Sequence, residues 1–218
     1  MTAPVNKRRY DSTRRRAAAE RTRAAVLAAA RDLFTRHGYP GTAVADIAAA
    51  AGVSIDTMYA TVGRKPQLLL AVHDMALAEG DTPVAAEQRD YVQQIRAAPT
   101  ATQKLATYAA ALARILPHTV PLALALAAAG QSDPACRQAY RDLTERRAAN
   151  MRLLARDLRG TGELRDDLDD DTVADLIWSM NDPDYYTLIL SRGHTPQQYA
   201  DLVQDVWTRT LLQNPAPG

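Results

Sequence analysis

Apolar residues recur at helical spacing along most of this chain, and runs with the alternating pattern of strands are scarce. A first amphipathic helix is predicted from about Thr13 to His37, and Gly38 ends it. A short second helix follows, with an apolar face at Val44, Ile47, Ala48 and Ala51. Alanine is abundant and only 10 residues are glycine, which also favours helix. The pattern therefore predicts an all-α protein.

The residues after this short helix have the chemistry of a tight turn between two helices. Gly52 can take the positive φ that such a turn requires, and Val53 is expected to fill the corner between the helices. Ser54 can accept hydrogen bonds from the free N–H groups at the start of the next helix. We interpret the segment as a helix-turn-helix, in which the second helix, Ser54 to Val62, lies in the major groove of DNA.

The rest of the chain is predicted to be a series of helices marked by capping residues and prolines. Their predicted starts are Pro66, Thr82, Thr102, Val120, Asp133, Asp171, Asp182 and Thr195. Pro117 is expected to break the helix from Thr102, which leaves residues 120–129 as a separate buried helix. A stripe on the last helix is predicted to pack against a second copy of the chain, through Val203, Val206, Trp207 and Leu211. The alternative for this stripe is an internal core.

Around the helix-turn-helix, the chain resembles the TetR family of bacterial transcriptional repressors, of the alanine- and arginine-rich actinobacterial type. The family's first helix and its Gly-Tyr end are similar to residues 26–34 and to His37-Gly38-Tyr39. The family's Ser-Lys-Glu-x-Leu-Leu opening of the fourth helix is similar to residues 63–69. The likeness covers residues 23–75 and departs from the family at Ala43, Val62 and Gly63-Arg64. The alanine removes one phosphate contact and cap, and the valine fills a core site with less volume.

The resemblance implies a helix-turn-helix DNA-binding head and a helical-bundle domain for ligand binding and dimerisation. We place a basic N-terminal arm and the start of the first helix at residues 1–22, the DNA-binding domain at 23–66, and the larger domain at 67–218. Residues up to about Ser12 are expected to be flexible. With 218 residues and 47% hydrophobic content, the chain is large enough to bury two cores.

The net charge of +1 conceals a separation of charge along the chain. Residues 1–23 contain eight basic and two acidic residues, whereas residues 161–190 contain nine acidic residues and one basic residue. A polyanion is therefore expected to bind at the N-terminal end. We recognise no run of about 18 apolar residues and no signal sequence, so we expect a cytoplasmic protein without membrane contact. The single cysteine, Cys136, excludes an internal disulfide.

The resemblance also implies which side chains meet the bases of double-stranded DNA. Ile55 and Ala60 are expected to touch thymine methyl groups. Thr57 and Thr61 are expected to bond either bases or phosphates. Asp56 either accepts from a cytosine amino group or only complements the helix dipole.

A second group is expected to hold the DNA backbone and to fix register, not sequence. Tyr59 and Lys65 match phosphate-binding positions of the family, and Ser54 caps the recognition helix. Thr42 is expected either to cap the preceding helix or to bond a phosphate. The arm is expected to add affinity and a preference for a narrow A·T minor groove, through Arg14, Arg15 and Arg16. The alternative for the arm is a disordered, solubilising tail.

If the second domain resembles those of TetR regulators, it encloses a pocket for a hydrophobic or amphipathic small molecule. Such an effector alters DNA binding only if it binds one arrangement of the two heads more tightly than the other. The candidate lining residues are Tyr108, His118, Met151, Trp178, Met180 and Tyr185. Each of them is also compatible with a role in the core. No cofactor is expected.

Enzymatic chemistry is not expected. The acidic residues between Asp166 and Asp171 fall in a loop and at a helix start, where Asp is favoured as a cap. The four histidines are scattered, without HxxxH or CxxC spacing, so no metal site is expected. The interpretation is a ligand-responsive repressor that binds a palindromic operator as a homodimer. The alternative is an architectural protein that binds DNA with little sequence preference and has no ligand.

Overall fold

The computed structural model describes residues 7–213 of the chain. Within this range the chain forms ten α-helices, one 3-10 helix and no strand, which confirms the predicted all-α class. The helices are α1 (Lys7–His37), α2 (Val44–Ala50), α3 (Ile55–Thr61), α4 (Lys65–Leu77), η1 (Ala86–Gln88), α5 (Asp90–Ala97), α6 (Ala101–Ala129), α7 (Pro134–Arg159), α8 (Asp170–Met180), α9 (Pro183–Ser191) and α10 (Pro196–Leu211).

The chain divides into two compact units, residues 1–72 and 73–218, and the division falls inside α4. The domain boundary predicted from the sequence, at residue 66, lies at the beginning of this helix. Helix α1 begins at Lys7, so residues 7–12 are helical, although they were expected to belong to a flexible arm. The rest of the predicted arm, residues 1–6, lies outside the described residues.

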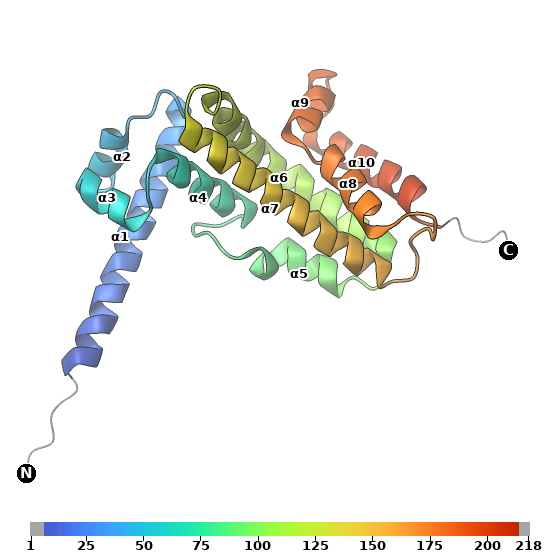
Figure 1. Ribbon diagram of the computed structural model, residues 1–218, viewed down its shortest axis with the longest axis horizontal. Coiled ribbons are helices and arrows are strands. Elements are labelled where there is room, and N and C mark those ends of the chain that lie inside the picture. The colour runs from blue at the N-terminus through green and yellow to red at the C-terminus, as the bar shows by residue number, and fades with distance from the viewer. Residues whose placement is uncertain (1–6, 214–218) are drawn as a thin grey trace, which may run out of the picture. The chain divides into compact units, whose positions relative to one another are not determined.

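In the N-terminal unit, α1 is the support on which the two short helices pack. Val26, Ala30 and Phe34 form a buried stripe on α1 and are at most 4% exposed. Ile47 from α2 and Met58 from α3 are fully buried in this unit. This apolar contact holds α2 and α3 against α1, and Figure 1 shows both short helices beside α1.

The predicted turn between α2 and α3 is confirmed. Gly52 has a φ of 67°, a region that costs other residues roughly 1–2 kcal/mol. The N–H of Val53 donates to the Ala48 carbonyl at 3.0 Å, which closes the end of α2. Ser54 is the N-cap of α3, and its hydroxyl accepts from the Thr57 N–H at 3.1 Å.

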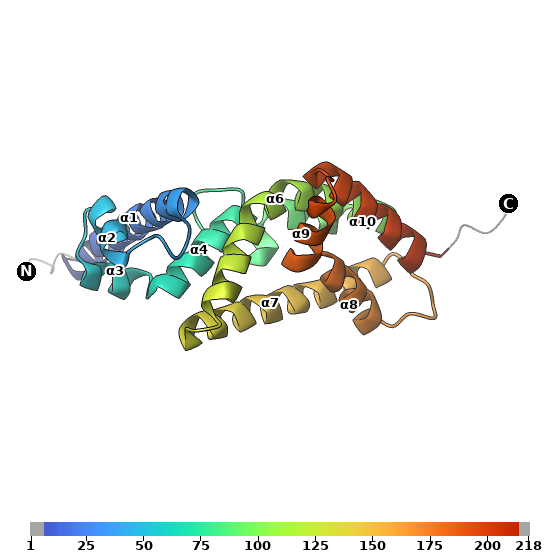
Figure 2. The ribbon, with the colours of Figure 1, turned by 90° about the horizontal axis from the view of Figure 1, so that it is seen from above.

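In the C-terminal unit, α6 is the central helix. Helices α5, α7, α9 and α10 all pack against it, and α8 packs against α7. Figure 2 shows α6 and α7 as the long helices of this unit, with α10 beside α6. The core of this unit includes the buried side chains of Leu105, Leu112, Ile115, Val173 and Ile177.

The predicted break at Pro117 is wrong, because α6 continues through Pro117 and Pro121 to Ala129. A proline inside a helix removes one N–H donor and disfavours the helix. Here Leu116, Val120 and Ala123 are at most 7% exposed, so packing on both sides of the prolines holds the helix together.

The uninterrupted α6 also corrects the expectation that the chain has no segment able to span a membrane. By length and composition, α6 is apolar enough to do so. Half of its most apolar 18-residue stretch is buried inside the structure, as in a core helix.

The predicted dimer stripe on α10 is also wrong. The side chains of Val203, Trp207 and Leu211 are fully buried, and α10 packs on α6 of the same chain. The Trp207 ring stacks on Tyr108 with 5.7 Å between ring centroids. Only Val206 retains partial exposure. A side chain that its own chain covers cannot also be covered by a partner, so the internal-core alternative describes this stripe.

Candidate nucleic-acid interface and internal cavity

Helix α3 presents one face to the interior and the opposite face to solvent. Met58 is the buried anchor and is 0% exposed. Ile55 and Tyr59 are 40% and 41% exposed, although both are large apolar or aromatic residues. Asp56, Thr57 and Ala60 are exposed beside them. The predicted base-facing residues therefore share one accessible surface, except for Thr61, which is half-buried.

The C-terminal end of α3 is held by two contacts that involve its backbone. The Thr61 hydroxyl donates to the Thr57 carbonyl at 2.6 Å. Arg23 of α1 donates from Nη1 to the Thr61 carbonyl at 3.0 Å. In the sequence Arg23 is only one of the basic residues of the N-terminal segment, and nothing near it shows that it reaches a helix so distant along the chain. The arginine fixes the orientation of α3 on α1.

Thr42 does not have either of the roles predicted for it. It is 2% exposed, and its hydroxyl donates to the carbonyls of Leu33 at 3.1 Å and Gly38 at 2.7 Å. The N-cap position of α2 is Ala43, with no capping bond from its side chain. Thr42 therefore stabilises the end of α1. Its hydroxyl proton is already donated within the protein and is not available to a phosphate.

The basic residues that the sequence predicts to contact DNA differ in how they are held. The Lys65 ammonium lies 4.2 Å from the centroid of the buried Tyr39 ring, a cation–π distance. Arg14, Arg15 and Arg16 are all exposed on α1, and Arg16 pairs with Glu20 at 3.2 Å. Because these three arginines are consecutive in a helix, they point in directions about 100° apart. They cannot all face one surface.

The C-terminal unit contains a cavity of about 510 Å³. Its wall comes from the end of α4, from η1 and α5, from α6 and α7, and from the α8–α9 junction. Exposed Glu87, Arg96 and Leu153 belong to the lining, so the cavity reaches the surface between η1, α5 and α7. Most of the interior is apolar, as at Leu77, Ile95, Leu112, Leu116, Leu143 and Leu154. This size lies within the range of about 300–1,000 Å³ that is usual for small-molecule sites.

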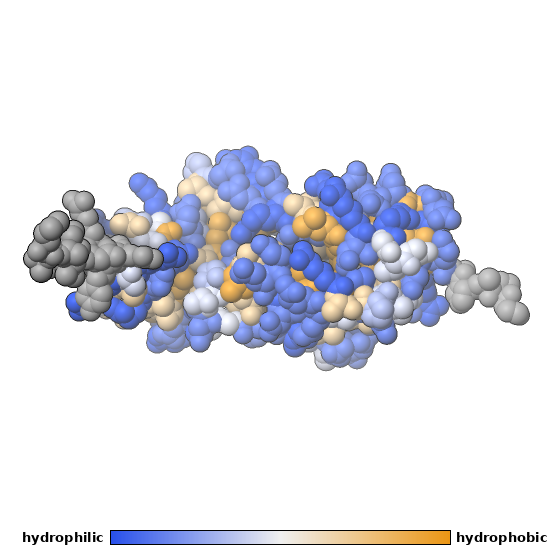
Figure 3. Space-filling model, turned by 90° about the horizontal axis from the view of Figure 1, so that it is seen from below, coloured by the Kyte–Doolittle hydropathy of each residue, from blue (hydrophilic) through white to orange (hydrophobic). Residues whose placement is uncertain are grey.

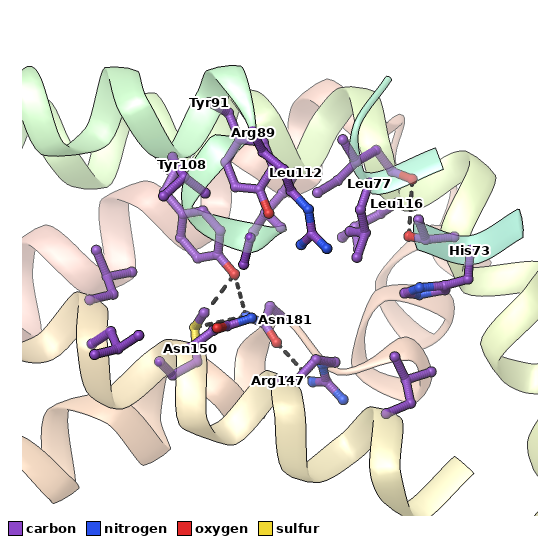
Figure 4. Close-up of a pocket in the computed structure, with 18 of the residues that line it drawn as sticks. His73, Leu77, Arg89, Tyr91, Tyr108, Leu112, Leu116, Arg147, Asn150 and Asn181 are labelled. Atoms are coloured by element: carbon purple, nitrogen blue, oxygen red, sulfur yellow. Dashed lines mark hydrogen bonds between the residues drawn. The ribbon is translucent and has the colours of Figure 1, made fainter. Parts of the chain in front are cut away.

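A connected polar group occupies one wall of the cavity (Figure 4). The Asn181 amide donates to the Tyr108 hydroxyl at 2.6 Å, and its oxygen accepts from Arg147 at 2.8 Å. The Tyr108 hydroxyl donates to the Met151 sulfur at 3.5 Å. Burial raises the pKa of Tyr108, so the phenol keeps its proton.

His73 and Arg89 form a second polar group, and Figure 4 shows both at the cavity. They are 5% and 6% exposed, and both lie near Asp74. Burial lowers the pKa of His73, more than the adjacent Asp74 raises it, so the imidazole is neutral at pH 7. Burial alone would raise the pKa of Asp74, but contacts with His73 and Arg146 hold it below its usual value.

Two of the six predicted pocket residues, Tyr108 and Met151, line this cavity. The prediction that His118 lines the pocket is wrong, because its side chain is exposed on the outside of α6. The other three pack against the core of the unit without lining the cavity: Trp178, Met180 and Tyr185. Residue type did not reveal which face of a helix each side chain occupies. His73, Arg89 and Asn181 were not predicted.

The acidic cluster has structural partners. Asp169 caps α8 by accepting from the Thr172 N–H at 2.7 Å. Asp170 pairs with Arg159 at 3.0 Å. Among the described residues, no group of three or more His, Cys, Asp or Glu side chains is arranged to hold a metal ion.

Comparison with known proteins identifies both units. The family model of bacterial regulatory proteins of the tetR family matches residues 26–72. The family model of the tetracyclin repressor-like C-terminal domain matches residues 99–206. A search of curated proteins gave no match.

Several solved structures share the fold. A putative transcriptional regulator from Saccharomonospora viridis, in complex with choline, is 20% identical with a TM-score of 0.65, over 88% of this chain and 98% of that one. A TetR transcriptional regulator from Chloroflexus aurantiacus is 21% identical with a TM-score of 0.63, over 90% and 98%. The regulator FadR from Bacillus subtilis, in complex with stearoyl-CoA, is 20% identical with a TM-score of 0.63, over 84% and 96%. From the family models that match its two units, we conclude that the chain belongs to the TetR family of ligand-responsive, DNA-binding transcriptional regulators.

Proposed function

We propose that this regulator represses transcription as a homodimer on a palindromic operator, with α3 in the major groove and an effector in the cavity of the C-terminal unit. The observation that carries the proposal is the exposed face of α3. A helix anchored by buried Met58 displays Ile55 and Tyr59 to solvent, where burial would otherwise be favourable. DNA is the partner that would cover them.

The proposed base contacts follow from the chemistry of this face. Ile55 and Ala60 suit the methyl group of thymine, and Thr57 suits a base or a phosphate. The Thr57 hydroxyl is 2.8 Å from that of Ser54, which pre-orients it at the start of α3. Asp56 accepts from cytosine or stabilises the helix N-terminus. Thr61 contributes at most an acceptor, because it donates to its own helix.

Phosphate contacts supply the remaining affinity. The proposed contacts are the hydroxyl of Tyr59, an exposed residue of α3, and the ammonium of Lys65, at the start of α4. Thr42 is excluded from this group because it is buried and donates to two carbonyls. The arginines at the start of α1 add positive charge, and their spread around the helix means that only some of them meet the same strand.

The cavity supports a role for an effector. Its volume and mostly apolar wall suit a small organic molecule, and its polar groups would orient that molecule. Two regulators of the same fold were solved with choline and with stearoyl-CoA, ligands of very different size and charge. The fold alone therefore does not specify the effector, and its identity depends on the residues that line this cavity.

The proposed dimer needs a surface other than the buried stripe of α10. Leu176 of α8 and Leu188 of α9 are 39% and 61% exposed, and we place the interface there. On the face that Figure 3 shows, hydrophilic side chains predominate and apolar ones form small separate areas. Twofold symmetry at α8 and α9 would duplicate α3 and so produce two half-sites. We place the protein in the cytoplasm, where the family acts on DNA.

Selection of bound sequences from a random duplex pool tests this function. We expect enrichment of an inverted repeat whose two half-sites lie about one helical turn apart or a multiple of it. Gln197→Ala, an exposed change on α10, is the matched control and should select the same motif. Enrichment of unrelated sequences, with uniform protection of DNA in footprinting, would instead support the architectural alternative.

A further inference from the structure

We propose that the effector cavity selects an organic anion, a hydrophobic carboxylate, and that Arg89 is the residue that binds its charged group. This inference rests on the proposed function of the cavity and goes further by assigning the charge of the ligand and its anchor. The guanidinium of Arg89 points into the cavity in Figure 4.

Arg89 is a buried cation with few hydrogen bonds or opposite charges around it. The residue is 6% exposed, and its Nε is buried with no hydrogen-bond partner among the described residues. Arg89 forms an ion pair with Asp74, but the distance of 3.9 Å from Nη2 to Oδ1 is too long for a hydrogen bond. A buried charge without hydrogen bonds is costly, and the cost favours any anion that can enter.

Asp74 cannot fully compensate Arg89, because it is shared. Arg146 donates to both carboxylate oxygens of Asp74, at 3.0 and 3.3 Å. The carboxylate also lies 3.7 Å from Nδ1 of His73, which is neutral at pH 7. The Asp74 carboxylate thus forms hydrogen bonds with Arg146, whereas its contact with Arg89 is longer and weaker.

The half-buried charges of the cavity lining, Arg147 and Asp157, are already paired. Arg147 donates to Asp182 at 3.2 Å, to Asn181 at 2.8 Å and to the Trp178 carbonyl at 3.2 Å. Asp157 accepts from Lys104 at 2.9 Å. A ligand anion would therefore gain most at Arg89, whose planar fork matches a carboxylate.

The apolar wall specifies the rest of the ligand. Leu77, Leu112 and Leu116 lie near Arg89 in Figure 4 and come from α4 and α6. A hydrocarbon chain on this wall leaves water while its carboxylate reaches the guanidinium. The polar group of Tyr108 and Asn181 also lines the cavity and can hold a second polar atom of the ligand.

Three probes with the same hydrocarbon chain separate charge from burial. Calorimetric titration of the full-length protein with decanoate, decan-1-ol and decyltrimethylammonium, without DNA, measures affinity alone. We expect decanoate to bind roughly tenfold or more tightly than the alcohol, as for a hydrogen bond to a charged group. The ammonium compound should bind most weakly.

Variants then assign the effect to one residue. Arg89→Gln should lower decanoate affinity about tenfold while leaving decan-1-ol binding unchanged, and Arg89→Lys should retain part of it. Arg156→Gln, at an exposed arginine of α7 that does not line the cavity, is the matched control and should change little. Melting curves check that each variant folds.

The proposal is overturned if decanoate shows no saturable binding, if the alcohol or the ammonium compound binds as tightly, or if Arg89→Gln keeps full affinity. These results leave the DNA experiment unaffected. A protein that selects a palindrome but ignores decanoate would keep the proposed function and lose only this inference.

Discussion

At the scale of the residue, local chemistry was readable from the sequence and remote partners were not. Gly52 and Ser54 act on neighbours within a few positions, and both roles are confirmed. Thr42 was assigned wrongly because its acceptor at Leu33 belongs to the preceding helix. Arg89 resembles any surface arginine in sequence, and only the folded unit shows that it is buried in the cavity wall.

The stability of the protein should depend on pH through His73. In the unfolded chain this imidazole titrates near its ordinary pKa of about 6.5, whereas burial lowers its pKa in the folded protein. Between those values the unfolded state binds more protons, so stability is lost as pH falls below about 6.5. The loss should be steepest at about 1.4 kcal/mol per pH unit for this one group.

Urea denaturation between pH 7.5 and 5.5 measures this effect. His73→Gln should lose less stability over that interval than the wild type does. His118→Gln, at an exposed position, is the matched control and should behave as the wild type. Equal loss in the wild type and His73→Gln would show that other groups cause the pH dependence, Asp74, Arg89 and Arg146 being the charges nearest to His73.

At the scale of the element, periodicity predicted where most helices lie but not which of them pack together. The α10 stripe has the spacing of an interface, yet it faces α6 of the same chain. Pro117 has the chemistry of a helix breaker, yet buried neighbours override it. For the stripe, the deciding contact comes from a helix far away in sequence, and for Pro117 it is the burial of its neighbours; the local pattern of apolar residues shows neither.

Helix α1 leads to a prediction about salt dependence. Each phosphate contact contributes about 0.9 to the slope of log affinity against log salt concentration. Because Arg14, Arg15 and Arg16 point in different directions on a helix, replacing all three by Ala should reduce the slope by about one or two contacts, not three. Filter binding to the selected operator at several salt concentrations measures the slope.

Arg209→Ala, an exposed change on α10, is the control for this series and should leave the slope unchanged. An unchanged slope in the triple variant would mean that these arginines stay in solvent when DNA is bound, as in the alternative of a solubilising segment.

At the scale of the whole molecule, the proposed DNA-binding surface and the proposed effector site lie in different units. The N-terminal unit displays α3, and the C-terminal unit contains the cavity. The fold class and the helix-turn-helix were predictable from the sequence because their signals are local. Most of the cavity wall was not, because it is assembled from α4, η1, α5, α6, α7 and the α8–α9 junction, which meet only in the folded unit.

The most direct test of the account is to repeat the duplex selection with Ile55→Gln. Glutamine prefers adenine where isoleucine would touch a thymine methyl. If two copies of α3 read the operator, the base preference should change at one position in each half-site, symmetrically about the centre of the palindrome. An unchanged motif bound with unchanged affinity would contradict the claim that the exposed face of α3 meets the bases.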